Sequence, residues 1–151
     1  MLERALALAF AVVAVAGSAS ASTGRFVARA EIHPACKTDI TSTTVTLSGC
    51  VAHAPYSGTG RGTLDVSYGA KVDILRNRGT QAGTMTIHGQ TGHDTLVIHF
   101  AGVVTINPSA SHGTWSAVSR SGVFARSAPS KGTYSTETPD QGVHVSFDVR
   151  G

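Results

Sequence analysis

The sequence predicts an all-β fold, a single antiparallel eight-stranded up-and-down barrel, with a β-sandwich as the alternative. Three observations lead to this prediction. Helix formers are scarce after residue 22, whereas Thr, Ser, Val and Gly are abundant, and this composition favours half-buried strands joined by tight turns. Apolar and polar residues alternate with a period of two in several segments. Finally, Gly-Thr followed by a large apolar residue recurs along the chain.

The N-terminal segment differs in kind from the rest of the chain. Arg4 precedes an Ala/Leu/Val run over residues 5–16, and residues 17–21 end in small residues of the A-x-A type. This pattern predicts a secretory signal peptide over residues 1–21 and one β-barrel domain over residues 22–151. Because a spanning helix needs roughly 20 apolar residues, the shorter run argues against a membrane anchor. We therefore expect a secreted protein whose mature chain has no stable membrane insertion.

The two cysteines, Cys36 and Cys50, predict one disulfide, because an even count in an exported protein most simply means a bridge. Closing a loop of this length stabilises the folded state by about 3 kcal/mol in the chain-entropy model. A redox or metal-binding pair would need closer spacing, such as Cys-x-x-Cys, or further thiols.

Strands are expected from the start of the predicted domain. Phe26, Ala28, Ala30 and Ile32 alternate with polar or exposed positions, which predicts a first strand ended by His33-Pro34. A second strand is expected over residues 43–47. The small, turn-forming residues of segment 53–62 indicate a loop.

Four Gly-Thr-apolar triplets are expected to begin strands, because Gly tolerates turn geometry and Thr favours the extended backbone. They begin at Gly62, Gly83, Gly113 and Gly132. Returning strands are expected at 72–74, 96–100, 123–124 and 143–149, and residues 107–112 are expected to form a polar loop. Consecutive antiparallel hairpins satisfy their edges by closing into a barrel.

The C-terminal third carries a family resemblance. The runs Gly113-Thr114-Trp115, Ser121-Gly-Val-Phe-Ala125 and Gly132-Thr133-Tyr134 resemble the end of the small eight-stranded barrels of the allene oxide cyclase and dirigent type, particularly bacterial secreted members. The resemblance implies a calycin-like barrel whose lumen can hold an apolar small molecule. In plant members the lumen supports cyclisation or stereoselective coupling, but no catalytic residue of those enzymes matches a position here.

Five aromatic residues are expected to point into the barrel. They either line a ligand cavity or fill the interior, because barrels of eight strands can be packed solid or hold one small ligand. These lumen candidates are Trp115, Tyr134, Phe100, Phe124 and Phe147.

Seven histidines are the unusual polar feature of the chain. If residues 89–92 form a hairpin loop, His88 faces His93 across the first rung, close enough to share zinc or copper. A third ligand would have to come from His112 or His144. In the alternative interpretation, His88, His99 and His144 occupy the polar positions of their strands and face water.

Other chemistry has little support in the sequence. No Gly-x-Ser-x-Gly elbow is present, and Asp65 and Asp73 are expected to share a solvated face near Lys71. The net charge is +3, but the basic residues are scattered singly, which excludes a nucleic-acid partner. The densest basic group, residues 76–79, is typical of an exposed turn.

Three hypotheses for function follow. The leading one is a secreted barrel that binds an apolar or lipid-like small ligand in its lumen, without catalysis and without a cofactor. The alternative implied by the resemblance is an isomerase or cyclase. The third is a metal-binding protein that uses His88 and His93.

Overall fold

The computed structural model describes residues 25–138 and 145–151. The predicted signal peptide, Val143 and His144 lie outside the described residues. The described chain forms nine strands and one short helix: β1 (Val27–Ile32), β2 (Ala35–Ile40), β3 (Thr44–Gly58), β4 (Gly60–Asp73), β5 (Arg78–His88), β6 (Thr95–Ile106), β7 (Ser109–Ser121), α2 (Phe124–Ser127), β8 (Lys131–Glu137) and β9 (Val145–Arg150).

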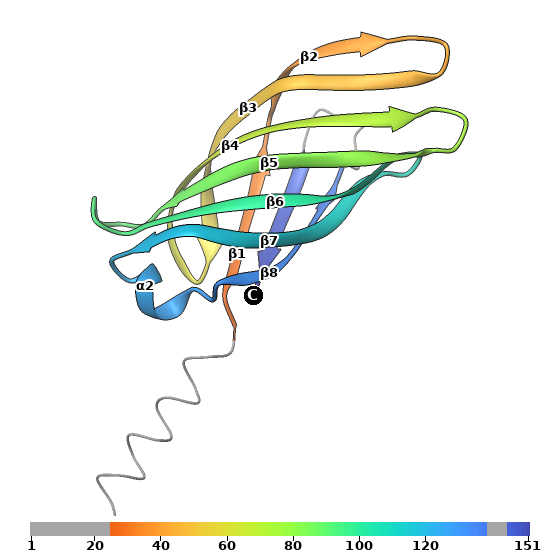
Figure 1. Cartoon of the computed structure of the whole chain (residues 1–151). Coiled ribbons are helices and arrows are strands. Elements are labelled where there is room, and N and C mark those ends of the chain that lie inside the picture. Colours follow the sequence, from red (N-terminus) through yellow and green to blue (C-terminus); the bar gives the residue numbers. More distant parts are fainter. Residues whose placement is uncertain (1–24, 139–144) are drawn as a thin grey trace, which may run out of the picture.

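The strands form one antiparallel sheet in the order β1-β9-β8-β7-β6-β5-β4-β3-β2. A further pairing of β1 with β3 closes this sheet into a barrel. The predicted eight-stranded antiparallel barrel is confirmed, and the structure shows that it is closed, with β2 as an extra strand paired to β3 beyond the closure. Figure 1 shows the curved sheet from its β2–β7 side.

Alternation with a period of two explains which side chains lie inside. Phe26, Ala28, Ala30 and Ile32 are all buried, as the sequence predicted for the first strand. The same alternation in β4 buries the even-numbered residues from Leu64 to Val72. The core is therefore a single column of side chains enclosed by the barrel wall.

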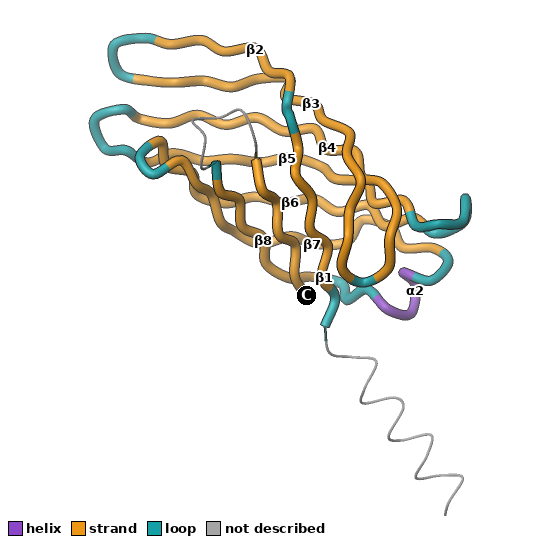
Figure 2. The backbone as a smooth tube through the Cα atoms, turned by 180° about the vertical axis from the view of Figure 1, so that it is seen from behind, coloured by secondary structure: helices purple, strands orange, loops and turns teal. Residues whose placement is uncertain are grey.

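The strands differ in length, and this difference gives the barrel two unlike ends. β3 to β7 have 11 to 15 residues, whereas β1, β8 and β9 have six or seven. The long strands project beyond the short ones, as Figures 1 and 2 show. We call the end formed by the β2–β3, β4–β5 and β6–β7 turns the open end, and the end near α2 the closed end.

Helix α2 covers the closed end of the barrel. Phe124 is 1% exposed, and its ring meets that of Phe26 edge-on, with 6.1 Å between centroids. Asp94 Oδ1 accepts a hydrogen bond of 2.8 Å from the Val123 backbone N–H and so fixes the start of the turn. The prediction of a returning strand at residues 123–124 was wrong. Gly122 has φ +61°, and the chain continues from it into one turn of helix.

Two of the four Gly-Thr-apolar triplets do not begin strands. Gly62 and Gly132 lie near the starts of β4 and β8, but Gly83 and Gly113 lie inside β5 and β7. Packing explains Gly83, since a Cβ there would lie 2.7 Å from the Phe100 ring. Glycines in these triplets therefore occur both at turns and inside strands, where atoms of a neighbouring strand lie too close for a side chain.

The turns also differ from those expected. Residues 53–62, expected as a loop, belong to β3 and β4, which are joined by a tight turn at Thr59. No turn interrupts β4 at residues 69–70, because the turn lies at residues 74–77. The expected loop over residues 107–112 is shortened, since β7 already begins at Ser109. The strand β2 was not predicted.

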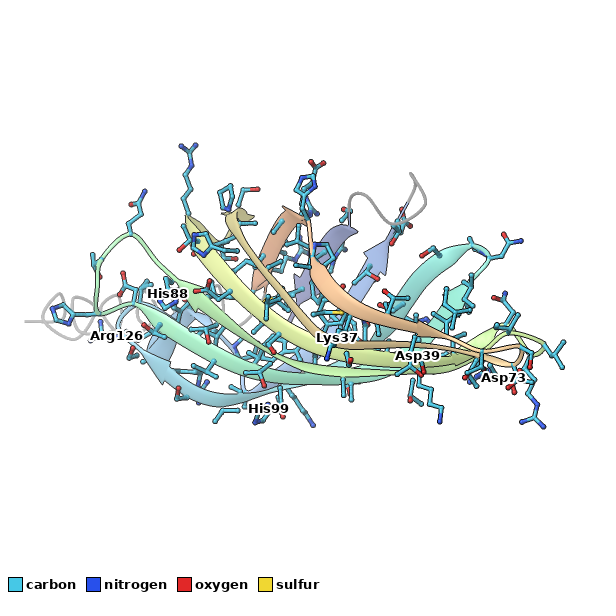
Figure 3. The ribbon with its side chains drawn as sticks, turned by 90° about the horizontal axis from the view of Figure 1, so that it is seen from above. Lys37, Asp39, Asp73, His88, His99 and Arg126 are labelled. Atoms are coloured by element: carbon cyan, nitrogen blue, oxygen red, sulfur yellow. A yellow bond between two sulfur atoms is a disulfide. The ribbon has the colours of Figure 1, made fainter. Side chains whose placement is uncertain are left out.

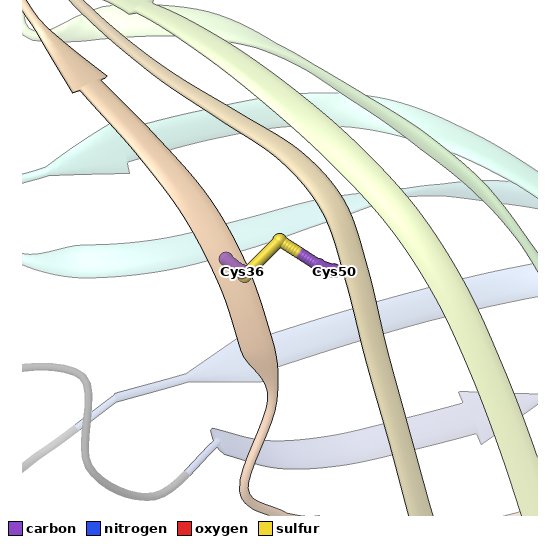
Figure 4. Close-up of a disulfide and its surroundings, with 2 residues drawn as sticks. All are labelled: Cys36 and Cys50. Atoms are coloured by element: carbon purple, nitrogen blue, oxygen red, sulfur yellow. A yellow bond between two sulfur atoms is a disulfide. The ribbon is translucent and has the colours of Figure 1, made fainter.

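The predicted disulfide between Cys36 and Cys50 is formed, with an S–S distance of 2.00 Å. It joins β2 to β3, as Figure 4 shows. The bridge lies where the β2–β3 register shifts, between the Ala35↔Val51 and Lys37↔Ser48 pairs. It therefore holds the extra strand to the barrel at an irregular point in the ladder.

Replacing both cysteines by alanine should lower the free energy of unfolding by about 3 kcal/mol, because the unfolded chain gains the entropy of the opened loop. Urea denaturation followed by far-ultraviolet circular dichroism measures the change. Wild-type protein treated with a reductant serves as the control and should unfold at nearly the same urea concentration as the variant. Equal midpoints for the variant and the oxidised wild type would contradict the prediction.

Candidate functional site

Aromatic side chains fill the closed half of the interior. Phe100, Tyr134 and Phe147 contact one another with ring centroids 4.9, 5.4 and 5.6 Å apart. Trp115 lies deeper and packs edge-on against Phe26 at 6.1 Å. Its indole N–H donates to the Thr133 and Arg150 carbonyl oxygens, which satisfies the polar end of the side chain.

The five predicted lumen residues, Trp115, Tyr134, Phe100, Phe124 and Phe147, all lie inside the barrel with at most 2% exposure. They pack together as core, and none of them lines the cavity described next.

A cavity of about 400 Å³ occupies the interior toward the open end. Its lining comes from both sides of the barrel, including β2 and the inner faces of β3 to β8. The less polar part of the lining is Pro34, Cys36, Leu47, Tyr68, Ala70, Val104 and Ala110. The more polar part is Thr38, Gln81, Ser109, Thr136 and Thr138. The cavity therefore lies where the long strands extend beyond the ends of the short ones.

Buried polar side chains separate this cavity from the aromatic core. The Tyr134 hydroxyl donates to Gln81 Oε1 at 3.2 Å, and Ser111 Oγ lies 2.6 Å from Thr136 Oγ1. Ser111 also hydrogen-bonds to Tyr134, which joins the two pairs. We call Gln81, Tyr134, Ser111 and Thr136 the polar row. Its two ends, Gln81 and Thr136, line the cavity.

Three members of the polar row, Gln81, Ser111 and Thr136, were not predicted from the sequence, although their positions in the strands carry a signal. Gln81 has the same parity in β5 as the buried Met85, and Ser111 has the same parity in β7 as Trp115. Thr136 stands two residues after Tyr134 in β8. A polar residue at an inward position of an alternating strand needs a partner inside, which points to a buried polar site.

The side chains that line the site are uncharged at neutral pH, which favours an uncharged ligand. Burial raises the pKa of Tyr134 to about 12, and the hydrogen bond from Ser111 opposes this rise. Tyr134 is therefore protonated at neutral pH and acts as a hydrogen-bond donor rather than as a base. The residues found to line the cavity include no Asp, Glu, His, Lys or Arg. Such a site can hold and orient an uncharged polar group.

The expected pairing of His88 with His93 was wrong. His88 pairs with Thr95, and His93 lies in a longer loop, residues 89–94, closed by a hydrogen bond from Gly89 N to Asp94 O. The predicted register was shifted by two residues because a four-residue loop was assumed. Among residues 25–138 and 145–151, no three His, Cys, Asp or Glu side chains are placed to hold a metal ion.

His88 instead takes part in a surface cluster on the outside of the barrel. Asp65 accepts a hydrogen bond of 2.6 Å from His53 Nδ1 and one of 3.2 Å from His88 Nε2. The bond from His53, more than that from His88, lowers the pKa of Asp65. All three side chains are at least 44% exposed, so the cluster contributes little to stability.

The remaining polar residues considered in the sequence lie on the outer surface of the barrel. Asp65 and Asp73 do lie on the outer face of β4, where Asp73 accepts from the Arg76 backbone N–H at 2.9 Å. His99 points away from the barrel, as Figure 3 shows, and lies 3.0 Å from the Thr84 hydroxyl. His112 is exposed on β7.

No protein-family model matches this chain, and no curated protein matches it in sequence. The described residues contain no helix that is long and apolar enough to cross a membrane.

All three tyrosines should ionise later than a free tyrosine, because burial raises the pKa of Tyr56, Tyr68 and Tyr134 above 10. The phenolate absorbance of the folded protein should show its last step near pH 12, and Tyr134→Phe should remove that step. Since the folded pKa exceeds the unfolded one, this stabilising contribution is complete below pH 10 and is lost as the pH rises toward 12.

The denatured protein is the control for this titration, and its tyrosines should ionise together near pH 10. A Tyr134→Phe variant that keeps the last step would show that another tyrosine is the deeply buried one.

Proposed function

We propose that this chain is an exported, non-catalytic binding protein that holds a small apolar molecule in the cavity at the open end of its barrel. The observation that carries the proposal is a cavity of about 400 Å³ whose walls combine apolar and polar side chains in similar measure, with the buried polar row at its floor. Small-ligand sites in proteins have volumes of about 300–1,000 Å³ and combine apolar walls with a few placed polar groups.

The lining also supports a chemical class for the ligand. Leu47, Ala70 and Val104 give the apolar part of a ligand surfaces from which water is excluded, at roughly 25 cal/mol per Å² buried. Gln81 and Thr136 offer neutral donors and acceptors to one polar group. A carboxylate would lose its hydration without meeting a cation among the lining residues that the structure describes. The proposed ligand therefore carries a hydroxyl or carbonyl group.

Export is part of this proposal. It rests on the predicted signal peptide over residues 1–21 and agrees with the disulfide between Cys36 and Cys50, because disulfides persist in oxidising compartments.

A second candidate is an isomerase or cyclase of the allene oxide cyclase or dirigent type. The observation that favours it is the same polar row, which places hydrogen-bonding groups beside the cavity of a calycin-like barrel. Because Tyr134 stays protonated, the row would hold a substrate oxygen and fix its conformation rather than remove a proton. Turnover of a bound substrate, absent in the boiled protein, would distinguish this candidate from simple binding.

Filling the cavity should abolish binding of a neutral apolar probe. Ala70 points into the cavity, so Ala70→Phe places a ring there. We expect at least a tenfold loss of affinity for N-phenyl-1-naphthylamine, measured by the fluorescence of the probe. Ala82→Phe is the matched control, because Ala82 is exposed on the neighbouring strand β5 and should leave affinity unchanged.

The anionic analogue 1-anilinonaphthalene-8-sulfonate tests the neutral character of the site. It should bind more weakly than N-phenyl-1-naphthylamine in spite of the net charge of +3. If the wild type binds neither probe nor a range of neutral alcohols, or if both phenylalanine variants bind equally well, the proposal fails.

Gln81→Leu should weaken binding of ligands with a hydroxyl group more than binding of hydrocarbons. Loss of one hydrogen bond in a buried site corresponds to about 1 kcal/mol, or roughly a fivefold to tenfold change in affinity. Competition by 1-octanol against the bound fluorescent probe measures this effect. An equal loss for 1-octanol and for an aromatic hydrocarbon such as naphthalene would contradict a polar contact at Gln81.

A further inference from the structure

Exposed apolar side chains gather on the turns of the open end. Leu75 is 84% exposed, Ile40 67%, Ile106 41% and Ile74 36%. They belong to three different hairpins, at the ends of β2 and β6 and in the β4–β5 turn. Single exposed apolar residues are ordinary, but a group of them on one end of a molecule marks an interaction site.

Hydrogen bonds join these three turns into one rim. The Ile74 backbone N–H donates to the Thr43 carbonyl at 2.9 Å, which links the first two turns. Asn77 Oδ1 accepts from the Ile106 and Asn107 backbone N–H groups, and its Nδ2 donates to the Asn107 carbonyl. The apolar side chains are therefore displayed from turns that are held together.

The same rim carries an excess of positive charge. Within four residues of the three turns, four basic side chains accompany two acidic ones: Lys37, Lys71, Arg76 and Arg78 with Asp39 and Asp73. Glu137, which pairs with Ala110 beside the β6–β7 turn, adds a third acidic side chain. Figure 3 shows Asp39 and Asp73 toward this end of the molecule, with Asp73 near the end of the strands and Lys37 closer to the middle. Asp73 Oδ2 lies 4.0 Å from Arg76 Nε, and Asp73 is also the cross-strand neighbour of Arg78.

We propose that the open end docks on the surface of an anionic lipid bilayer. The docking surface consists of Ile40, Ile74, Leu75 and Ile106 with Arg76 and Arg78. Burial of a leucine in an apolar environment is worth about 1.5–3 kcal/mol, and each basic residue near an anionic surface adds about 1 kcal/mol. Exposed apolar tips with adjacent arginines therefore match a lipid surface in both polarity and charge.

The position of the cavity supports this choice of partner. Thr38, Ala70 and Val104 line the cavity and lie on the strands that end in the docking surface. Docking would bring the open end of the barrel against the lipid, where an apolar ligand is concentrated. This interaction is peripheral, because turns of three hairpins touch the bilayer and no segment has to cross it.

Vesicle flotation with the purified, disulfide-bonded protein tests the proposal. The protein should float with vesicles of phosphatidylcholine and phosphatidylglycerol and bind pure phosphatidylcholine much more weakly. Leu75→Ser should lower the partition coefficient about tenfold. Arg76→Gln and Arg78→Gln should each lower it about fivefold. Val118→Ser is the matched control, because Val118 is 55% exposed on β7 outside the docking surface and should change nothing.

Three outcomes would overturn the proposal: wild-type protein that does not bind the anionic vesicles, Leu75→Ser protein that binds as the wild type does, or equal losses in Leu75→Ser and Val118→Ser. Light scattering adds a fourth, since a dimer that Leu75→Ser dissociates would make this surface a contact between two copies. Ala70→Phe should retain vesicle binding, so a failure of the ligand-binding proposal is distinguishable from a failure of this one.

Discussion

The barrel depends on one short seam, where β1 meets β3. Only two residue pairs, Ala28↔Gly58 and Arg29↔Ser57, join these strands. Gly58 has φ +136°, and a Cβ there would lie 2.2 Å from the Val27 carbonyl oxygen, so a side chain would push the strands apart. Thr59 reinforces the seam, since its N–H donates to the Val27 carbonyl and its hydroxyl accepts from the Val27 N–H. Without this closure, the core would lie on one face of an open sheet.

The unequal lengths of the strands divide the enclosed space. Where all eight strands are present, aromatic rings from several of them meet and pack as core. Beyond the ends of the short strands only part of the wall continues, and the side chains that reach inward are smaller. The polar row lies at this boundary, where the inward residues of β7 and β8 are Ser111 and Thr136 and no longer aromatic residues such as Trp115 and Tyr134. The same difference in length thus produces the packed core, the cavity and the projecting turns.

The cavity and the docking surface belong to the same end of the molecule, and this shared position gives the two proposals a common logic. A neutral apolar ligand dissolves poorly in water and collects in lipid. If the open end of the barrel contacts the bilayer, such a ligand can move between the lipid and the cavity without passing through water. The closed end is covered by α2 and filled by Phe26 and Phe124.

The all-β class, the inward aromatic residues and the Cys36–Cys50 bridge could be predicted from the amino-acid sequence, because they follow from alternation with a period of two and from cysteine count. The same pattern favoured an antiparallel barrel but also allowed a β-sandwich, and the pairing of β1 with β3 decides for the closed barrel. Tertiary structure decided the rest. The register of His88 depends on the length of a loop that composition does not fix, and Gly83 marks packing against Phe100 rather than a strand start. The polar row joins residues up to 55 positions apart, Gln81 to Thr136, which meet only once the sheet has closed. Local patterns assign a side chain to a face, whereas the partners it meets there are set by strand register and closure.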